Sequence, residues 1–317
     1  MMPGPFSLFL EHTEVILGEG AVIERLRRDT GHELDPYLVN SAFIYHDDQR
    51  ASLEAIYRGY LEIGKHSGLP LLLSTPTWRA SRERIEQAGY SGRDVNSDNY
   101  RFLEALRSSY GEYADKVVIC GLLSCRGDAF KPDEALSEGD ARQFHTWQAQ
   151  KLAHSGVDFL LAATLPALGE ALGLAQALAA TAVPYVISFV LRREGTLLDG
   201  TPLHEAIAAI DTQVSPAPLA YMANCTHASN FRSAMRVKGN DDQACRNRVI
   251  GLFANTAALS PEELDDHPEV VTEEPQRFGD DVAALHEEFG LKVLGGCCGT
   301  DNRHIQALVE RLIPFHR

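Results

Sequence analysis

Basic residues are scarce in this chain. Among its 317 residues, 29 are Lys or Arg and 44 are Asp or Glu, which gives a formal net charge of −15. A nucleic-acid-binding surface needs a basic patch or stripe, so this balance argues against one. No apolar run reaches the length of a membrane-spanning helix. The first residues, MMPGPFSLFLEHTEV, lack the basic segment of a signal peptide and already carry Glu11. We therefore expect a cytoplasmic protein.

Cysteines are few as well. Six in a chain of this size, without a secretion signal, do not form a disulfide framework. We interpret Cys120, Cys125 and Cys245 as ordinary buried thiols, because free cysteine is commonly buried. The adjacent pair Cys297 and Cys298 is different. It lies in the stretch GGCCG, whose glycines indicate close backbone approach and unusual φ angles.

The sequence also lacks a glycine-rich phosphate turn, since GEGAVI (18–23) is too short for a dinucleotide fingerprint. It contains instead short apolar runs that alternate with amphipathic stretches. Each run has the length of a strand and is apolar on both faces, as in a buried parallel sheet. The predicted strands are 15–18, 69–74, 117–123, 157–163, 183–190, 217–223, 249–255 and 292–296, and helices are predicted at 137–156, 166–181 and 301–312.

Eight strands alternating with helices predict an α/β fold, a (β/α)8 TIM barrel formed as a single domain by residues 1–317. A doubly wound open sheet is the alternative, but it would need the phosphate turn that is missing. Among the helices, 137–156 is predicted to stop at Gly156, and 301–312 is predicted to begin at an N-cap formed by Asp301 or Thr300.

Active sites of such barrels lie at the C-terminal ends of the strands. The first strand is followed by Glu19, the second by a segment with Trp78, the fourth by Ala163-Thr164, the sixth by Asn224-Cys225-Thr226-His227, the seventh by Asn255 and the eighth by Cys297-Cys298. Strands six and eight are separated by one strand in a closed barrel, so their three cysteines can converge. Three thiolates form a soft ligand set that selects zinc, and three protein ligands leave a fourth position open for substrate.

These motifs make the chain resemble the homocysteine S-methyltransferase family over most of its length. GGCC with the following helix is similar to the family's C-terminal zinc motif, and Asn224-Cys225 is similar to its upstream zinc cysteine. Weaker likenesses are LSEGDARQFHTWQAQKLAHSGVDFLLAATLP around the fourth strand, ISFVLRREGTLLDG around the fifth, and TPTWRAS at 75–81.

The resemblance implies that Cys225, Cys297 and Cys298 bind Zn²⁺ and act catalytically through it. A zinc-bound thiol would be present as thiolate and would attack the methyl group of an onium donor. S-methylmethionine, S-adenosylmethionine or a betaine would serve as that donor. The residues predicted to bind substrate are Glu19, Thr164, Trp78, Asn224 and Asn255.

Two departures from the family pattern concern the amino group of homocysteine. Where the family has Asp after strand one, this chain has Glu19, which either binds the ammonium or is a surface turn carboxylate. Where the family has Glu-Thr-x-Pro after strand four, this chain reads Ala163-Thr164-Leu165-Pro166. An ammonium buried without its partner is costly. We therefore expect a different or broader thiol acceptor than homocysteine.

Other residues near the predicted site have two readings. His227 would be a fourth zinc ligand or, more in keeping with its position, a residue at a helix start or on the surface. Trp78 would hold a cationic donor by cation–π attraction or pack over the barrel. Arg192 and Arg193 would meet a substrate carboxylate or lie in a solvated loop. His304 is interpreted as helical packing or surface.

The leading functional prediction is a zinc-dependent thiol S-methyltransferase. The alternative is a barrel of the same family that binds thiol or metal without transfer; a zinc hydrolase is disfavoured because such enzymes use His and carboxylate ligands. The expected partners are a small-molecule thiol and a methyl donor, with neither nucleic acid nor membrane among them, and a homo-oligomer is left open.

Overall fold

A computed structural model describes residues 4–259 and 272–313. Its eight parallel strands close into a barrel in sequence order, with β1 paired to both β2 and β8. This closure confirms the predicted barrel, because an open doubly wound sheet would leave two edge strands. The strands are β1 (Ile16–Gly18), β2 (Leu71–Ser74), β3 (Val117–Ser124), β4 (Phe159–Leu165), β5 (Tyr185–Phe189), β6 (Ala220–His227), β7 (Val249–Asn255) and β8 (Val293–Gly296).

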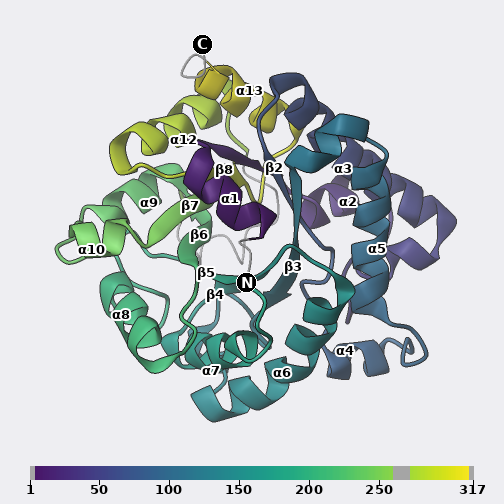
Figure 1. Ribbon diagram of the computed structural model, residues 1–317, viewed down its shortest axis with the longest axis horizontal. Coiled ribbons are helices and arrows are strands. Elements are labelled where there is room, and N and C mark those ends of the chain that lie inside the picture. Colours follow the sequence, from purple (N-terminus) through teal and green to yellow (C-terminus); the bar gives the residue numbers. More distant parts are fainter. Residues whose placement is uncertain (1–3, 260–271, 314–317) are drawn as a thin grey trace.

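Helices surround the barrel on its outside, except the first, which lies across one end of it (Figure 1). They are α1 (Pro5–His12), α2 (Ile23–Asp29), α3 (Asp47–Ser67), α4 (Arg82–Gln87), α5 (Val95–Ser108), α6 (Glu138–Ser155), α7 (Leu168–Ala179), α8 (Leu203–Gln213), α9 (Ala228–Met235), α10 (Gln243–Arg246), α12 (Pro275–Phe289) and α13 (Asn302–Leu312), with short 3₁₀ turns η1 (Phe43–Tyr45), η2 (Gly111–Lys116) and η3 (Pro132–Glu134). Within the described residues, none of these helices combines the length and apolar character needed to cross a membrane.

The predicted ends of the helices at 137–156 and 301–312 agree with the structure, whereas the helix predicted at 166–181 is shorter, Leu168–Ala179. Ser137 caps α6 by accepting a hydrogen bond from the Asp140 amide, and Gly156 ends this helix with φ 104°. Asp301, rather than Thr300, is the N-cap of α13, where it forms a capping box with His304. His304 is fully buried, so its packing interpretation is confirmed.

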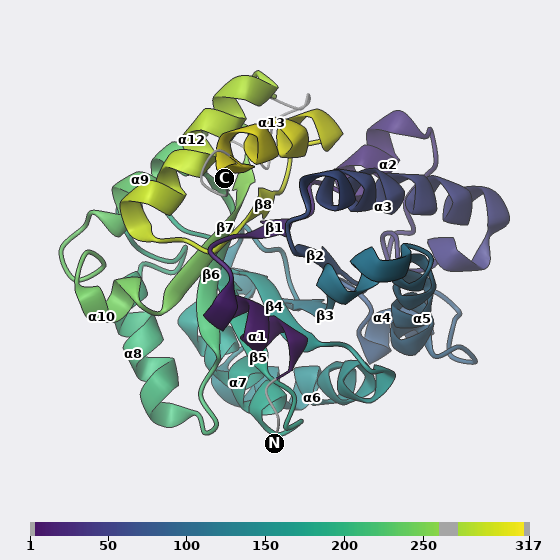
Figure 2. The ribbon, with the colours of Figure 1, turned by 45° about the horizontal axis from the view of Figure 1, so that its top comes forward.

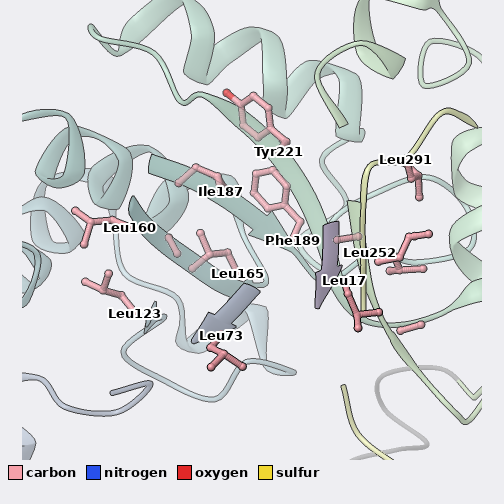
Figure 3. Close-up of a cluster of buried hydrophobic side chains, with 14 of the residues drawn as sticks. Leu17, Leu73, Leu123, Leu160, Leu165, Ile187, Phe189, Tyr221, Leu252 and Leu291 are labelled. Carbon is pink, nitrogen blue, oxygen red and sulfur yellow. The ribbon is translucent and has the colours of Figure 1, made fainter. Parts of the chain in front are cut away.

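Alternate strand positions divide the core into two layers. One side chain set points into the barrel, including Leu72, Phe159 and Phe253. The other set points outward and packs beneath the helices; Figure 3 shows Leu17, Leu165 and Tyr221 among its members. This division is the period-two pattern of a strand applied around a closed sheet.

Helix α1 covers the N-terminal end of the barrel (Figures 1 and 2). Its Phe6 is buried in the interior cluster and stacks on Phe159, with ring centroids 3.9 Å apart. Because this end is filled with apolar side chains, the opposite end is the one available for chemistry.

Candidate metal centre

The three predicted cysteines meet at the C-terminal end of the barrel. Cys225 belongs to β6, and Cys297 and Cys298 follow β8 directly. The sulfur atoms lie within 4.8 Å of one another, and the Sγ atoms of Cys225 and Cys297 are 2.7 Å apart. Strand β7 pairs with both β6 and β8, which is why residues distant in sequence converge here.

The backbone of Cys225 departs from regular strand geometry. The sequence places Cys225 after a strand ending at residue 223, whereas β6 continues through His227 with a shift in register between Asn224 and Thr226. Cys225 has φ 50°, a value in the left-handed region that a non-glycine residue rarely adopts. In an unbroken strand it would point away from the interior that Met222 and Asn224 face. The bulge turns its sulfur toward Cys297 instead.

The glycines beside the cysteine pair are required by close contacts. A Cβ atom on Gly295 would lie 2.8 Å from the Cα of Gly18, and one on Gly296 would lie 2.4 Å from Oγ1 of Thr300. Gly299 has φ 84°, and a Cβ there would lie 1.8 Å from Oγ1 of Thr256. The close backbone approach predicted from GGCCG is therefore present.

The cysteines of the cluster shift one another's pKa values. Side-chain hydrogen bonds with Cys225 and Cys298 hold the pKa of Cys297 well below its usual range, and the hydrogen bonds with Cys297 and Cys298 raise the pKa of Cys225. By contrast, burial raises the pKa of Cys125 and of Cys245 to about 11, as expected for ordinary buried thiols.

The donor set fits a metal ion. Sulfurs bound to zinc at about 2.3 Å in a tetrahedron are about 3.8 Å apart; the three sulfurs here all lie within 4.8 Å of one another, and the Cys225–Cys297 pair is closer, at 2.7 Å. Cys225 is buried, Cys297 is half-buried and Cys298 is exposed, so the cluster is reached from the side of Cys298.

Asn224 and Thr164 form a clamp beside Cys225. The Asn224 Oδ1 accepts hydrogen bonds from the Thr164 amide at 2.9 Å and from the Ser188 hydroxyl at 2.7 Å. Its Nδ2 donates to Thr164 Oγ1 at 2.8 Å and to the sulfur of Cys225 at 3.5 Å. Thr164 has φ 61° and lies inside β4, at a register shift between Ala162 and Leu165, so the strand does not end at residue 163 as predicted. Both predicted residues therefore orient the cluster.

Asn255 lies at the end of β7 and touches the cysteine pair. Its Oδ1 accepts a hydrogen bond from the Cys298 amide at 3.1 Å. Its Nδ2 is buried and has no hydrogen-bond partner within the described part of the chain. A buried donor without a hydrogen-bond acceptor is energetically costly. This nitrogen is therefore the clearest group of the site that a bound molecule could pair with.

Glu19 is buried, with 7% of its surface exposed, so the reading as a surface carboxylate is wrong. Its Oε2 accepts a hydrogen bond from the Ser74 amide at 3.2 Å, and its carbonyl accepts one from the Gly296 amide at 2.8 Å. Burial raises the pKa of this carboxyl to about 8. Glu19 is therefore a buried carboxyl that lies one strand away from the cysteine pair.

His227 is not part of the cysteine group. It is the N-cap of α9, where Nδ1 accepts a hydrogen bond from the Ser229 amide at 3.1 Å. Its Nε2 faces Oε1 of Glu273 at 3.3 Å. The helix-start interpretation is confirmed, and a fourth protein ligand from this residue does not agree with the structure.

Arg79 and Arg193 lie in different surroundings: the first covers an aromatic ring and the second lies in solvent. The guanidinium of Arg79 stands over the Trp78 ring, 4.2 Å from its centroid, so one face of the indole is already covered. Arg193 is exposed beside Glu194 in a solvated loop. The role of Trp78 in donor binding stays a prediction.

An apolar wall around the cluster was missed from the sequence. Val190 and Leu198 are buried together with Cys225, and Phe130 and Cys297 pack against them. Val190 follows β5, whereas Phe130 comes from the loop between β3 and α6. The only signal in the sequence is an aromatic residue inside a polar loop, which by itself does not say what it touches.

Fold and site together define a class: a parallel (β/α)8 barrel with a cluster of three cysteines, a possible metal-ligand set, at its C-terminal end. The chain belongs to the homocysteine S-methyltransferase family, whose sequence profile matches residues 16–312. This span contains all eight strands and the three cysteines, so the match covers the whole site. The family that the sequence motifs resemble is thereby confirmed.

Individual proteins of the family are distant relatives. The homocysteine S-methyltransferase of Escherichia coli is 28% identical over 194 residues, which cover 58% of this chain and 57% of that protein. The betaine–homocysteine S-methyltransferase 1 of Bos taurus is 24% identical over 328 residues, which cover 96% of this chain and 74% of that protein. The alignment thus spans little more than half of the bacterial relative.

Solved structures support the same fold. The metallated form of the homocysteine methyltransferase MmuM from Escherichia coli superimposes with a TM-score of 0.74 at 20% identity, covering 97% of this chain and 99% of that one. Its oxidised form gives a TM-score of 0.76 at 21% identity over the same shares. At these identities the likeness establishes the barrel alone.

Proposed function

We propose that this chain is a zinc-dependent S-methyltransferase that moves a methyl group from a small onium donor to a thiol, homocysteine or a related one. The observation that carries the proposal is the convergence of the Cys225, Cys297 and Cys298 sulfurs within 4.8 Å at the open end of the barrel. Three cysteine ligands are typical of zinc and leave a position for substrate sulfur. When bound, zinc keeps a thiol as its thiolate at neutral pH.

The residues of this chain supply orientation and shielding. In this proposal the Asn224 clamp holds Cys225 in its strained conformation, and Asn255 fixes the Cys298 amide. The unpartnered Nδ2 of Asn255 would donate a hydrogen bond to an acceptor group of the substrate. The apolar side chains around Cys225 keep water from one side of the reacting sulfur. Methyl transfer needs mainly such positioning, because the reaction is a direct displacement between two bound substrates.

The test is a transfer assay on zinc-loaded protein across a panel of thiols with S-methylmethionine, S-adenosylmethionine and betaine as donors. We expect methyl transfer to at least one thiol, and we expect Cys298→Ala to abolish it together with most of the zinc content. Cys245→Ala is the matched control, because this buried cysteine lies on α10 outside the cluster. Zinc and thiol binding without transfer in the whole panel would favour the binding-only alternative.

We propose further that the acceptor is a different or broader thiol than homocysteine. Ala163 faces the apolar interior where the resemblance expects a carboxylate, and Glu19 is the buried carboxyl beside the cysteines. Loss of one partner of a buried charge costs about 3–5 kcal/mol, and about 1.4 kcal/mol is tenfold in affinity.

Calorimetry on zinc-loaded protein tests the acceptor. We expect 4-mercaptobutyrate, which is homocysteine without its amino group, to bind at least as well as homocysteine. Ala163→Glu should reverse that order. Micromolar binding of homocysteine to the unaltered protein would refute the idea. We also propose that the protein acts in the cytoplasm, where its six free thiols stay reduced.

A further inference from the structure

A loop from the far side of the barrel reaches the cysteine cluster. The loop runs from Cys125, after β3, to Leu136, before α6. Its Phe130 packs against the apolar group formed by Val190, Leu198 and Cys225, to which Cys297 also belongs. A residue that follows β3 therefore packs against the same apolar cluster as the cysteines that come from β6 and β8.

Glu170, on α7, holds both ends of this loop. It is fully buried, and its Oε1 accepts a hydrogen bond from the Arg126 amide at 2.7 Å. Its Oε2 accepts one from the Leu136 amide at 3.1 Å, and His145 Nε2 lies 2.9 Å from Oε1. Because a carboxylate only accepts, Nε2 of His145 carries the proton in this contact. One buried side chain thus ties residues ten positions apart.

The loop is also held by Arg79, which follows β2, and by hydrogen bonds within the loop itself. Nη1 of Arg79 donates to the carbonyls of Cys125, Arg126 and Gly127, and the Asp128 amide donates to Glu134 Oε2 at 3.0 Å. The Phe130 amide donates to Asp128 Oδ1 at 2.9 Å. These contacts fix the path of the loop between the two ends that Glu170 holds, and Phe130 lies on that path.

We propose that the Phe130 side chain forms a shielding wall on one side of the cysteine cluster. Glu170 is the positioning residue, because it holds the loop that carries Phe130. Phe130 shares an apolar cluster with the buried Cys225 and the half-buried Cys297, whereas Cys298 is exposed, so in this proposal substrates approach from the Cys298 side. The wall also keeps water from the apolar side of the two sulfurs. None of the catalytic residues predicted from the sequence performs this task.

Alkylation of the metal-free protein tests the wall directly. The protein is treated briefly with iodoacetamide, and each cysteine is quantified by peptide mass spectrometry. We expect Phe130→Ala and Glu170→Gln to speed alkylation of Cys225 and Cys297 about tenfold, because their exposure increases, while Cys298 keeps its rate and serves as the internal reference. Phe130→Leu, which keeps an apolar wall, should restore the slow rates.

A second readout, which rests on the proposed function, is transfer by the zinc-loaded protein. We expect kcat/KM to fall about tenfold in Phe130→Ala and in Glu170→Gln, and the double variant to be no worse than either single one, since both act on the same wall. If neither the unaltered protein nor any variant transfers a methyl group, the proposed function fails. The alkylation rates still show whether Phe130 shields Cys225 and Cys297.

Asp158→Asn is the matched control for Glu170→Gln. Asp158 is also a largely buried carboxylate that accepts a backbone hydrogen bond, from the Ile119 amide at 2.7 Å, but it lies before β4 at the opposite end of the barrel. It should lower stability without changing the alkylation ratio. If Phe130→Ala leaves the alkylation rates of Cys225 and Cys297 unchanged, the proposal is wrong. If these cysteines are alkylated at equal rates in Asp158→Asn and Glu170→Gln, Glu170 does not position Phe130. If Glu170→Gln does not fold, Phe130→Ala still tests the wall.

Discussion

The two ends of the barrel are built from opposite kinds of residue. At the N-terminal end, α1 inserts Phe6 against Phe159 in an apolar cluster. At the C-terminal end, Thr164 and Cys225 adopt φ angles of 61° and 50°, and Asn255 keeps a buried donor without a partner in the described chain. Backbone strain and an unpaired buried donor thus lie beside the cysteine cluster, whereas the N-terminal end is filled with apolar side chains.

The largest expected effects are on stability for a substitution at the N-terminal end and on zinc binding for one at the C-terminal end. Phe6→Ala removes a fully buried ring, so we expect the free energy of unfolding to fall by about 3–5 kcal/mol, with zinc content unchanged. Cys225→Ala should abolish zinc binding and transfer while changing the unfolding free energy of the metal-free protein far less. Urea denaturation and metal analysis of both variants measure this. Loss of zinc in folded Phe6→Ala would show that the ends are coupled.

A smaller effect should appear within the C-terminal end. Asn255→Ala removes the acceptor of the Cys298 amide and the free Nδ2 donor. We expect the KM for the thiol to rise about tenfold. Asn99→Ala is the control, because Asn99 is also buried with one unpartnered atom but lies on α5. An equal rise in KM in both variants would contradict a binding role for Asn255.

A further effect, on stability rather than on catalysis, concerns Glu19 and pH. Its pKa in the folded protein is about 8, against a usual value of 4.5, because burial disfavours the carboxylate. Between these values the folded state keeps a proton that the unfolded chain has released, so stability falls as pH rises from about 4.5 to about 8. The contribution is on the order of a few kcal/mol.

Glu19→Gln should flatten this decline. Urea denaturation of metal-free protein between about pH 5 and pH 8.5 measures it. Glu62→Gln, on the exposed side of α3, is the control and should keep the decline. A Glu19→Gln variant with the same pH slope as the unaltered protein would show that Glu19 is already ionised in the fold.

Much of the fold was predictable because its strands are apolar on both faces and its helices carry clear caps. All eight predicted strands are present, and Gly156 and Asp301 end and begin helices as expected. The extensions of β4 through Thr164 and of β6 through Cys225 were not predictable, since polar residues after an apolar run are typical of a loop. Their strand pairing depends on neighbours more than 20 residues away.

The sequence by itself determined the barrel and the cysteine set, because apolar periodicity and the position of residues at strand ends are local properties of a chain. Only the tertiary structure decided how the side chains around the cysteines are oriented and buried. It turned Cys225 inward through a bulge, enclosed Glu19, assigned His227 to a helix cap and brought Phe130 across the barrel. These outcomes depend on contacts between distant segments, and such contacts exist only once the sheet has closed.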